Sequence, residues 1–289
     1  MEEKSRRVGS ETWQEKDMVS TVVETARQNP CLGCPGYCCW QNIINLCGYD
    51  VLVIADNLHL KPTDFVVFAK LNDENPYNFK VDGSERAYCL ALNMKEVPDG
   101  SRRCIFSLDL PNDQIRCGIY PFRPVACRAY PLAFAGQEVL VKPWALCPEG
   151  AWDTNQLDFP YWREELGRHD MEFAIYACIV GSWNKTAMNQ TRLEKLDFVP
   201  FLDFLMNIYS RLDTVRREVP AEAWPEIWKE WRCYTVRELN PLLLKSNGTA
   251  GMASWAWWLE SVKKVIATVS QDVRLQPGEL EKSLEEAVL

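Results

Sequence analysis

The chain has 289 residues, of which 47% are hydrophobic and 25% charged, so it is long enough to bury a substantial core and ordinary in composition for a globular protein. Its 40 acidic residues outnumber its 32 basic ones, and no stripe of Lys or Arg stands out, which argues against a nucleic-acid-binding surface. The longest apolar run, residues 173–183, is about half the length that spans a bilayer, so we expect no membrane span.

The N-terminal residues 1–28 read as a polar leader, with a short helix expected at residues 17–27. Residues 1–16 lack the apolar core of a secretory signal, so we expect a cytoplasmic protein. The chain contains 12 cysteines and only 2 histidines. In a reducing compartment, cysteines are more often metal ligands or catalytic thiols than structural disulfides.

Four of the cysteines lie close together in the stretch CLGCPGYCC at residues 31–39. A cysteine that serves only as a small apolar side chain has no reason to cluster in this way. The clustering therefore indicates a metal site, a redox centre or disulfides.

Helix caps and alternating apolar residues predict the secondary structure in the middle of the chain. Asp50 is expected to cap a helix over residues 51–58, and the pair Thr63-Asp64 is expected to start a helix that runs to about Lys70. From residue 85, short alternating runs separated by Pro, Gly, Asn and Asp are typical of strands in a small sheet. The predicted strands cover residues 87–93, 102–108, 114–119 and 138–144.

A second group of four cysteines lies within or beside these predicted strands. Folding of the sheet back on the first stretch could bring the two groups of thiols together. The members of the second group are Cys104, Cys117, Cys127 and Cys147.

From residue 153 onward the pattern is helical. Predicted helices start near residues 158, 197, 224 and 252, and their apolar positions recur at spacings of three and four. Most of the 12 tryptophans fall in this region, where we expect them to fill a core; a groove for an aromatic or peptide ligand is the alternative.

These patterns together predict an α+β protein. We expect a leader at 1–28, a cysteine-rich metal-binding domain at 29–152, and an all-helical region at 153–289 that could contact a protein partner.

The second cysteine group contains the long motif CGIYPFRPVACRAYP at residues 117–131. With the first stretch, the segment around residues 50–68 and the closing Cys147-Pro148, it resembles the bacterial YkgJ-like cysteine-cluster proteins, which carry a zinc- or iron-chelating domain of the CxxCxxCC type. The resemblance covers roughly residues 31–150. One departure is an extra residue before Cys38, so the loop between Cys34 and Cys38 must bulge.

The resemblance implies a ligand set of eight cysteines. Eight thiols make two sets of four, enough for two tetrahedral zinc ions or two iron–sulfur clusters. The irregular spacings favour iron–sulfur over zinc, since paired C-x2-C zinc knuckles are lacking. The implied ligands are Cys31, Cys34, Cys38, Cys39, Cys104, Cys117, Cys127 and Cys147.

Two arginines flank Cys127 in the motif. Arg123 and Arg128 could offset the negative charge of a thiolate-bound cluster and donate hydrogen bonds to it, or they could be ordinary surface residues. His169 falls on the apolar face of its predicted helix and is expected to be a core histidine rather than a ligand. The cysteines outside the motif are expected to be buried and not to bind metal: Cys47, Cys89, Cys178 and Cys233.

Three functions are compatible with this pattern. The first is a metal-binding protein that transfers electrons, handles or senses metal, or uses the metal as a scaffold. The second, by analogy with flagellin lysine-N-methylases, in which a related domain occurs, is an enzyme that methylates a protein side chain. The third, thiol–disulfide exchange at Cys31 and Cys34, is disfavoured because Pro35-Gly36 interrupts the helix that such a pair needs.

Overall fold

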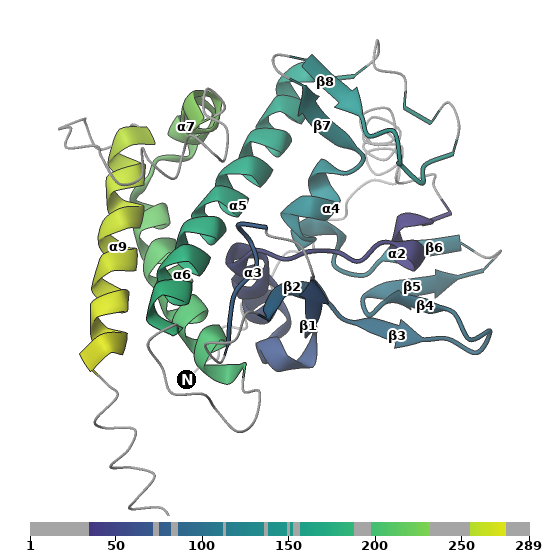
Figure 1. Ribbon diagram of the computed structural model, residues 1–289. Helices are drawn as coiled ribbons and strands as arrows, with labels where there is room; N and C mark the ends of the chain where they lie inside the picture. Colours follow the sequence, from purple (N-terminus) through teal and green to yellow (C-terminus); the bar gives the residue numbers. More distant parts are fainter. Residues whose placement is uncertain are drawn as a thin grey trace, which may run out of the picture.

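The computed structural model describes residues 35–71, 75–81, 86–111, 114–135, 138–148, 151–152, 157–187, 198–231 and 255–275. The predicted leader and its helix, and the cysteines Cys31, Cys34 and Cys233, lie outside these residues. Short strand pairs occupy one side of the molecule and long helices the other (Figure 1). The predicted α+β class is confirmed.

The strands of the described residues form separate two-stranded antiparallel pairs. The first pair is β1 (Val66–Leu71) with β2 (Ala87–Leu92), and the second is β3 (Met94–Glu96) with β4 (Arg102–Cys104). The third is β5 (Ser107–Leu110) with β6 (Gln114–Cys117), and the fourth is β7 (Leu132–Ala135) with β8 (Glu138–Val141). The short helical elements around them are α2 (Cys38–Gln41), α3 (Gly48–Leu58), η2 (Pro62–Asp64), η3 (Tyr120–Phe122) and α4 (Val125–Ala129).

The predicted strands are therefore present, but they do not make one sheet. The strand expected at residues 102–108 is divided by a turn at Ile105 and Phe106. At this turn the backbone forms hydrogen bonds that do not belong to the β3–β4 or β5–β6 pairs. The Ile105 N–H donates to the carbonyl of Asn93, and the Gly118 N–H donates to the carbonyl of Phe106. The chain thus turns from one short pair into the next instead of extending a single sheet.

The prediction of a helix that begins at Thr63-Asp64 is wrong. A single 3₁₀ turn, η2, leads directly into strand β1, which pairs with β2 from Val66 opposite Leu92 to Leu71 opposite Ala87. The β-branched and aromatic side chains at the start of β1 favour a strand and outweigh the helix-start signal before them.

Helix α3 begins three residues before the predicted start. Its N-cap is Cys47, and Asp50 occupies the third helical position of a capping box. The Cys47 N–H donates to Asp50 Oδ2 over 3.0 Å, and the Cys47 thiol donates to the same oxygen over 3.3 Å. The other oxygen, Oδ1, accepts the Val125 N–H over 2.8 Å, so one buried carboxylate joins the start of α3 to the start of α4.

The C-terminal region is helical as predicted. Helices α5 (Phe159–Ala187), α6 (Val199–Glu218), α7 (Trp224–Trp231) and α9 (Trp255–Leu275) pack on one another, with the 3₁₀ turn η5 (Ala221–Ala223) before α7. Trp162, Trp183 and Trp258 are among the largest fully buried side chains, which confirms that tryptophans fill this core. No helix among the described residues is both long and apolar enough to cross a membrane.

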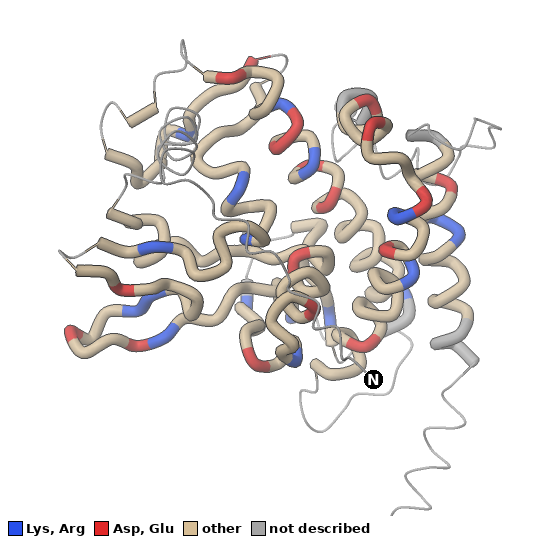
Figure 2. The backbone as a smooth tube through the Cα atoms, turned by 180° about the vertical axis from the view of Figure 1, so that it is seen from behind, with Lys and Arg blue, Asp and Glu red and all other residues tan. Residues whose placement is uncertain are grey.

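A single main core runs through the strand pairs and the helices. It includes Val51 and Ile54 of α3, Ile175 of α5 and Leu205 of α6. The charged pair Glu172–Arg216 is buried within it at 2.6 Å, and its guanidinium lies over the Tyr49 ring. Basic and acidic residues are interspersed along the strand pairs and helices (Figure 2), and the absence of nucleic-acid binding stays a prediction.

We predict that Gly48→Ala destabilises the fold by about 1–3 kcal/mol, because a Cβ at Gly48 would overlap the Tyr209 ring of α6. The matched control is Gly181→Ala in α5, where the added Cβ meets nothing within 4 Å. It should stabilise the helix by about 0.5–1 kcal/mol. Urea unfolding followed by circular dichroism measures both; equal effects would contradict the tight α3–α6 crossing.

A pH-dependent contribution of Asp50 to stability is also expected. Burial raises the pKa of Asp50 to about 6, although the N–H groups of Val125 and Cys47 act in the opposite direction. The folded state therefore holds this proton more tightly than the unfolded chain does. The resulting stability is fully present below about pH 4 and is lost as the pH rises through about 6.

The test compares wild type with Asp50→Asn in urea unfolding at a series of pH values under reducing conditions. The free energy of unfolding of wild type relative to the variant should fall by about 1–3 kcal/mol between pH 4 and pH 7. Glu172, whose pKa burial also raises, is present in both proteins and cancels in the comparison. If the free energies of unfolding of wild type and Asp50→Asn changed equally with pH, Asp50 would not titrate in this range.

Candidate metal centre

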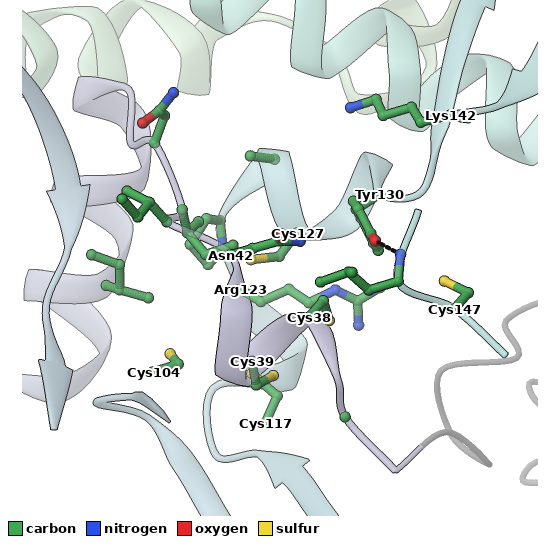
Figure 3. A pocket seen from close by; sticks show the side chains of 18 of the residues that line it. Cys38, Cys39, Asn42, Cys104, Cys117, Arg123, Cys127, Tyr130, Lys142 and Cys147 are labelled. Carbon is green, nitrogen blue, oxygen red and sulfur yellow. Dashed lines mark hydrogen bonds between the residues drawn. The ribbon is translucent and has the colours of Figure 1, made fainter. Parts of the chain in front are cut away.

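A cavity of about 670 Å³ lies between the strand pairs and the N-terminal half of α5. Its lining comes from α2, the ends of β4 and β6, η3, α4, the segment after β8, and α5. Figure 3 shows the cysteines gathered on one side of it. The predicted ligands that line the cavity are Cys38, Cys39, Cys104, Cys117, Cys127 and Cys147.

Each of these cysteines stands at the end of an element or in a short one. Cys38 and Cys39 open α2, Cys104 ends β4, and Cys117 ends β6. Cys127 is the central residue of α4. Strand ends and one-turn helices therefore deliver thiols to a common space from distant parts of the chain.

The approach of α2 to β6 depends on a glycine. Gly36 has φ +89°, a conformation that L side chains rarely adopt, and its carbonyl accepts the Cys39 N–H over 2.9 Å. A Cβ there would lie 3.0 Å from the Ile115 Cβ of β6. A residue with a side chain would therefore push Cys38 and Cys39 away from the strands.

Cys147 is positioned by a tyrosine. The Leu146 N–H donates to the hydroxyl of Tyr130 over 2.5 Å, and Tyr130 follows directly after α4 (Figure 3). The Ala145 N–H donates to the Lys142 carbonyl, which forms a turn before this contact. One side chain thus ties the loop that carries Cys147 to the helix that carries Cys127.

The thiols influence one another electrostatically. Burial raises the pKa of Cys104 to about 11, and it raises the pKa of Cys117 and Cys127 as well. Cys38, Cys104 and Cys117 each raise the pKa of Cys127 further. The pKa of Cys38 is raised first by its hydrogen bond with Cys39 and then by burial. These raised pKa values keep the four thiols protonated at neutral pH without a cation, so a metal that bound them would release protons.

The two arginines of the motif lie in different surroundings. Arg123 lines the cavity among the thiols, lies 3.8 Å over the Tyr120 ring, and lowers the pKa of Cys38, Cys117 and Cys127. Its buried Nε has no hydrogen-bond partner in the described part of the chain. A donor in that position is free to bind a thiolate or sulfide.

Arg128 does not line the cavity. Its Nε donates to Glu165 Oε2 of α5 over 2.7 Å, and its Nη2 binds the other carboxylate oxygen. The structure therefore places this guanidinium in a contact between α4 and α5, and only Arg123 of the two predicted arginines is at the cavity.

The cysteines outside the motif also lie elsewhere. Cys47 and Cys89 are buried, Cys178 is half-buried in α5, and none of the three lines the cavity. Cys47 serves as the N-cap of α3.

Sequence reasoning missed part of the cavity lining. Lys142, directly after β8, has no distinguishing pattern in the sequence. Tyr130 belongs to the second cysteine motif, but its hydrogen bond with Leu146 was not predicted. His169 was expected to be a core residue, but it is half-buried at the cavity, with its Nδ1 2.9 Å from Asp170 Oδ1 and its ring 4.7 Å from that of Phe173.

The donor set suits a soft metal, since the described lining contains six thiols and no carboxylate. Within the described residues, however, no group of three or more His, Cys, Asp or Glu is already arranged around a single ion. Two of the eight predicted ligands, Cys31 and Cys34, are outside the described part of the chain. The thiols thus share one space without forming a closed coordination sphere.

A family model described as "CxxCxxCC: Putative zinc- or iron-chelating domain" matches residues 30–148. This range agrees with the resemblance inferred from the two cysteine motifs. No curated protein and no solved structure matches the chain. Residues 30–148 are therefore similar to the CxxCxxCC family of zinc- or iron-chelating domains.

Proposed function

We propose that this protein binds iron as an iron–sulfur cluster through the thiols of the cavity. One observation carries the proposal: α2, β4, β6, α4 and the segment after β8 direct six cysteines of the family motif to a cavity that no carboxylate of the described residues lines. Thiolate ligands favour iron–sulfur clusters, zinc and Cu(I) over magnesium or calcium.

The spacing of the thiols supports a cluster over a single zinc ion. Zinc holds four sulfurs at about 2.3 Å, which requires them to lie close around one point. The described cysteines surround a wider space and leave no three of them around one ion. A polynuclear cluster, whose ligands bind different iron atoms, accommodates thiols that are farther apart.

Arg123 supports the same choice. A thiolate-bound cluster carries net negative charge, and hydrogen bonds to its sulfurs tune its reduction potential. Arg123 supplies a positive charge among the cysteines and a buried N–H without a partner in the described residues. When bound, the cluster would supply electron transfer or Lewis-acid chemistry, while Arg123 would offset its charge.

Four of the proposed ligands influence one another electrostatically: Cys38, Cys104, Cys117 and Cys127. At least one other member of this set raises the pKa of Cys104, of Cys117 and of Cys127. Cys39 and Cys147 line the same cavity, and with Cys31 and Cys34 they complete the eight proposed ligands.

Anaerobic purification tests the nature of the centre. The protein should be brown, with a broad visible absorbance, and should contain iron and acid-labile sulfide in similar amounts. A colourless protein with stoichiometric zinc and no sulfide would overturn the iron–sulfur proposal while leaving thiolate coordination intact.

We predict that Cys127→Ser loses about half or more of the bound metal, because Cys127 lies close enough to Cys38, Cys104 and Cys117 for all three to raise its pKa. The matched control, Cys178→Ser, removes a thiol in α5 outside the cavity and should retain the full metal content. Elemental analysis of both variants, with circular dichroism to confirm folding, makes the comparison. Equal metal loss from both would contradict the assignment.

Tyr130→Phe should weaken metal retention by about tenfold, because it removes the hydroxyl that binds the Leu146 N–H beside Cys147. Tyr161→Phe is the control, since that ring packs in a separate small core beside α5 and not at the cavity. Competition with a chelator measures retention. Unchanged retention in Tyr130→Phe would show that Cys147 is positioned without this contact.

A further inference from the structure

The cavity extends well beyond its cysteines. The thiols gather on one side of the cavity, so a metal centre bound by them would occupy that side (Figure 3). The whole cavity, at about 670 Å³, is as large as sites for small organic molecules, roughly 300–1,000 Å³. The space away from the thiols is lined by residues of the segment after β8, of α5 and of the loop around Tyr77.

One cation stands apart from the thiols. Lys142 extends into the cavity from the side opposite the cysteines (Figure 3). Its backbone is fixed by a hydrogen bond from its N–H to the Pro131 carbonyl, and no hydrogen bond or ion pair holds its Nζ within the described residues. Arg116, which also lines the cavity, is already engaged by Gln114 and by the Ile115 carbonyl.

The charges around Lys142 favour an anion. No Asp or Glu lines the described cavity, although Asp170 lies near enough to raise the pKa of Lys142 while burial lowers it. Asp170 is itself bound to His169 Nδ1. The ammonium group is therefore partly desolvated and has no direct carboxylate partner among the described residues, so a ligand anion would serve as its counter-ion.

Aromatic side chains line the same cavity as Lys142. The rings of Tyr77 and Phe173 meet edge to face at 5.2 Å. At the margin of the cavity, Trp144 is 71% exposed and Ile43 is 68% exposed. Exposed apolar side chains that border an apolar cavity gain most when a ligand covers them.

We propose that this half of the cavity binds a small organic carboxylate with an apolar, preferably aromatic, body: Lys142 pairs with the carboxylate, and Phe173, Tyr77 and Trp144 enclose the body. A single lysine matches a singly charged carboxylate better than a phosphate, which usually recruits an arginine fork or a helix N-terminus. The ligand would lie between Lys142 and the thiols. The inference rests on the proposed function in one respect: the metal centre is taken to occupy the side of the cavity where the thiols lie. Binding of the carboxylate does not itself require the metal.

Isothermal titration calorimetry on the full chain, purified anaerobically with its metal content measured, tests the proposal. The probes are 3-phenylpropionate and 1-naphthylacetate, each paired with its neutral amide, and phenyl phosphate. At least one acid should bind, about tenfold or more tightly than its amide. Binding of neither acid, equal binding of acid and amide, or tighter binding of phenyl phosphate would overturn the assignment.

The matched variants are Lys142→Met and Lys70→Met, which remove the same charge from the cavity and from an exposed position of β1. Lys142→Met should weaken the binding of the acid about tenfold while retaining metal and fold, and Lys70→Met should change nothing. Equal affinities in the two variants would refute the role of Lys142.

The same samples separate failure of this inference from failure of the metal proposal. A protein that holds iron and sulfide but binds no acid refutes only the carboxylate site. A protein that binds the acid through Lys142 but holds no metal refutes only the cluster. Binding of the acid that survives in Cys127→Ser supports a site that stands without the metal.

Discussion

The arrangement of the cavity depends on one buried carboxylate. Asp50 accepts the Cys47 N–H with one oxygen and the Val125 N–H with the other, so it fixes the first turn of α3 and the first turn of α4 to each other. Helix α4 carries Cys127 and is too short to hold its place by its own hydrogen bonds. Helix α3 packs against α6. The hydrogen bonds of Asp50 therefore hold α4, and with it Cys127, in a fixed position relative to the helical core.

Helix α5 provides the second connection between the two halves of the chain. It packs against α4, β7 and β8 along one part of its length and against α7 and α9 along another. Its Glu165 binds Arg128, and its Glu172 binds Arg216 of α6. His169 and Phe173 of the same helix line the cavity, so the helical region forms part of the cavity wall.

Six of the eight cysteines that the motifs singled out line one cavity, and their role as metal ligands stays a prediction. The motifs could single them out because residue type and spacing are legible in the sequence without knowledge of the backbone between them. The sequence could not separate Arg123 from Arg128, since the direction of each side chain depends on where α4 begins and on what α5 presents to it. Lys142 and His169 were missed for a similar reason: they are distant in sequence and meet at one cavity only through the packing of β8 on α5. The strand β1 was mistaken for a helix because a local start signal preceded residues whose cross-strand partners lie beyond residue 86.

The strand pairs have a consequence for biosynthesis. Each of them joins segments that are close in sequence, so each can form soon after it leaves the ribosome. Cys104 and Cys117 would then be displayed on finished hairpins while α5, which walls the cavity, is still being made. Nascent chains would pass through an interval in which these sulfurs are open to oxidants, and cellular yield would depend on how quickly translation delivers the covering helix.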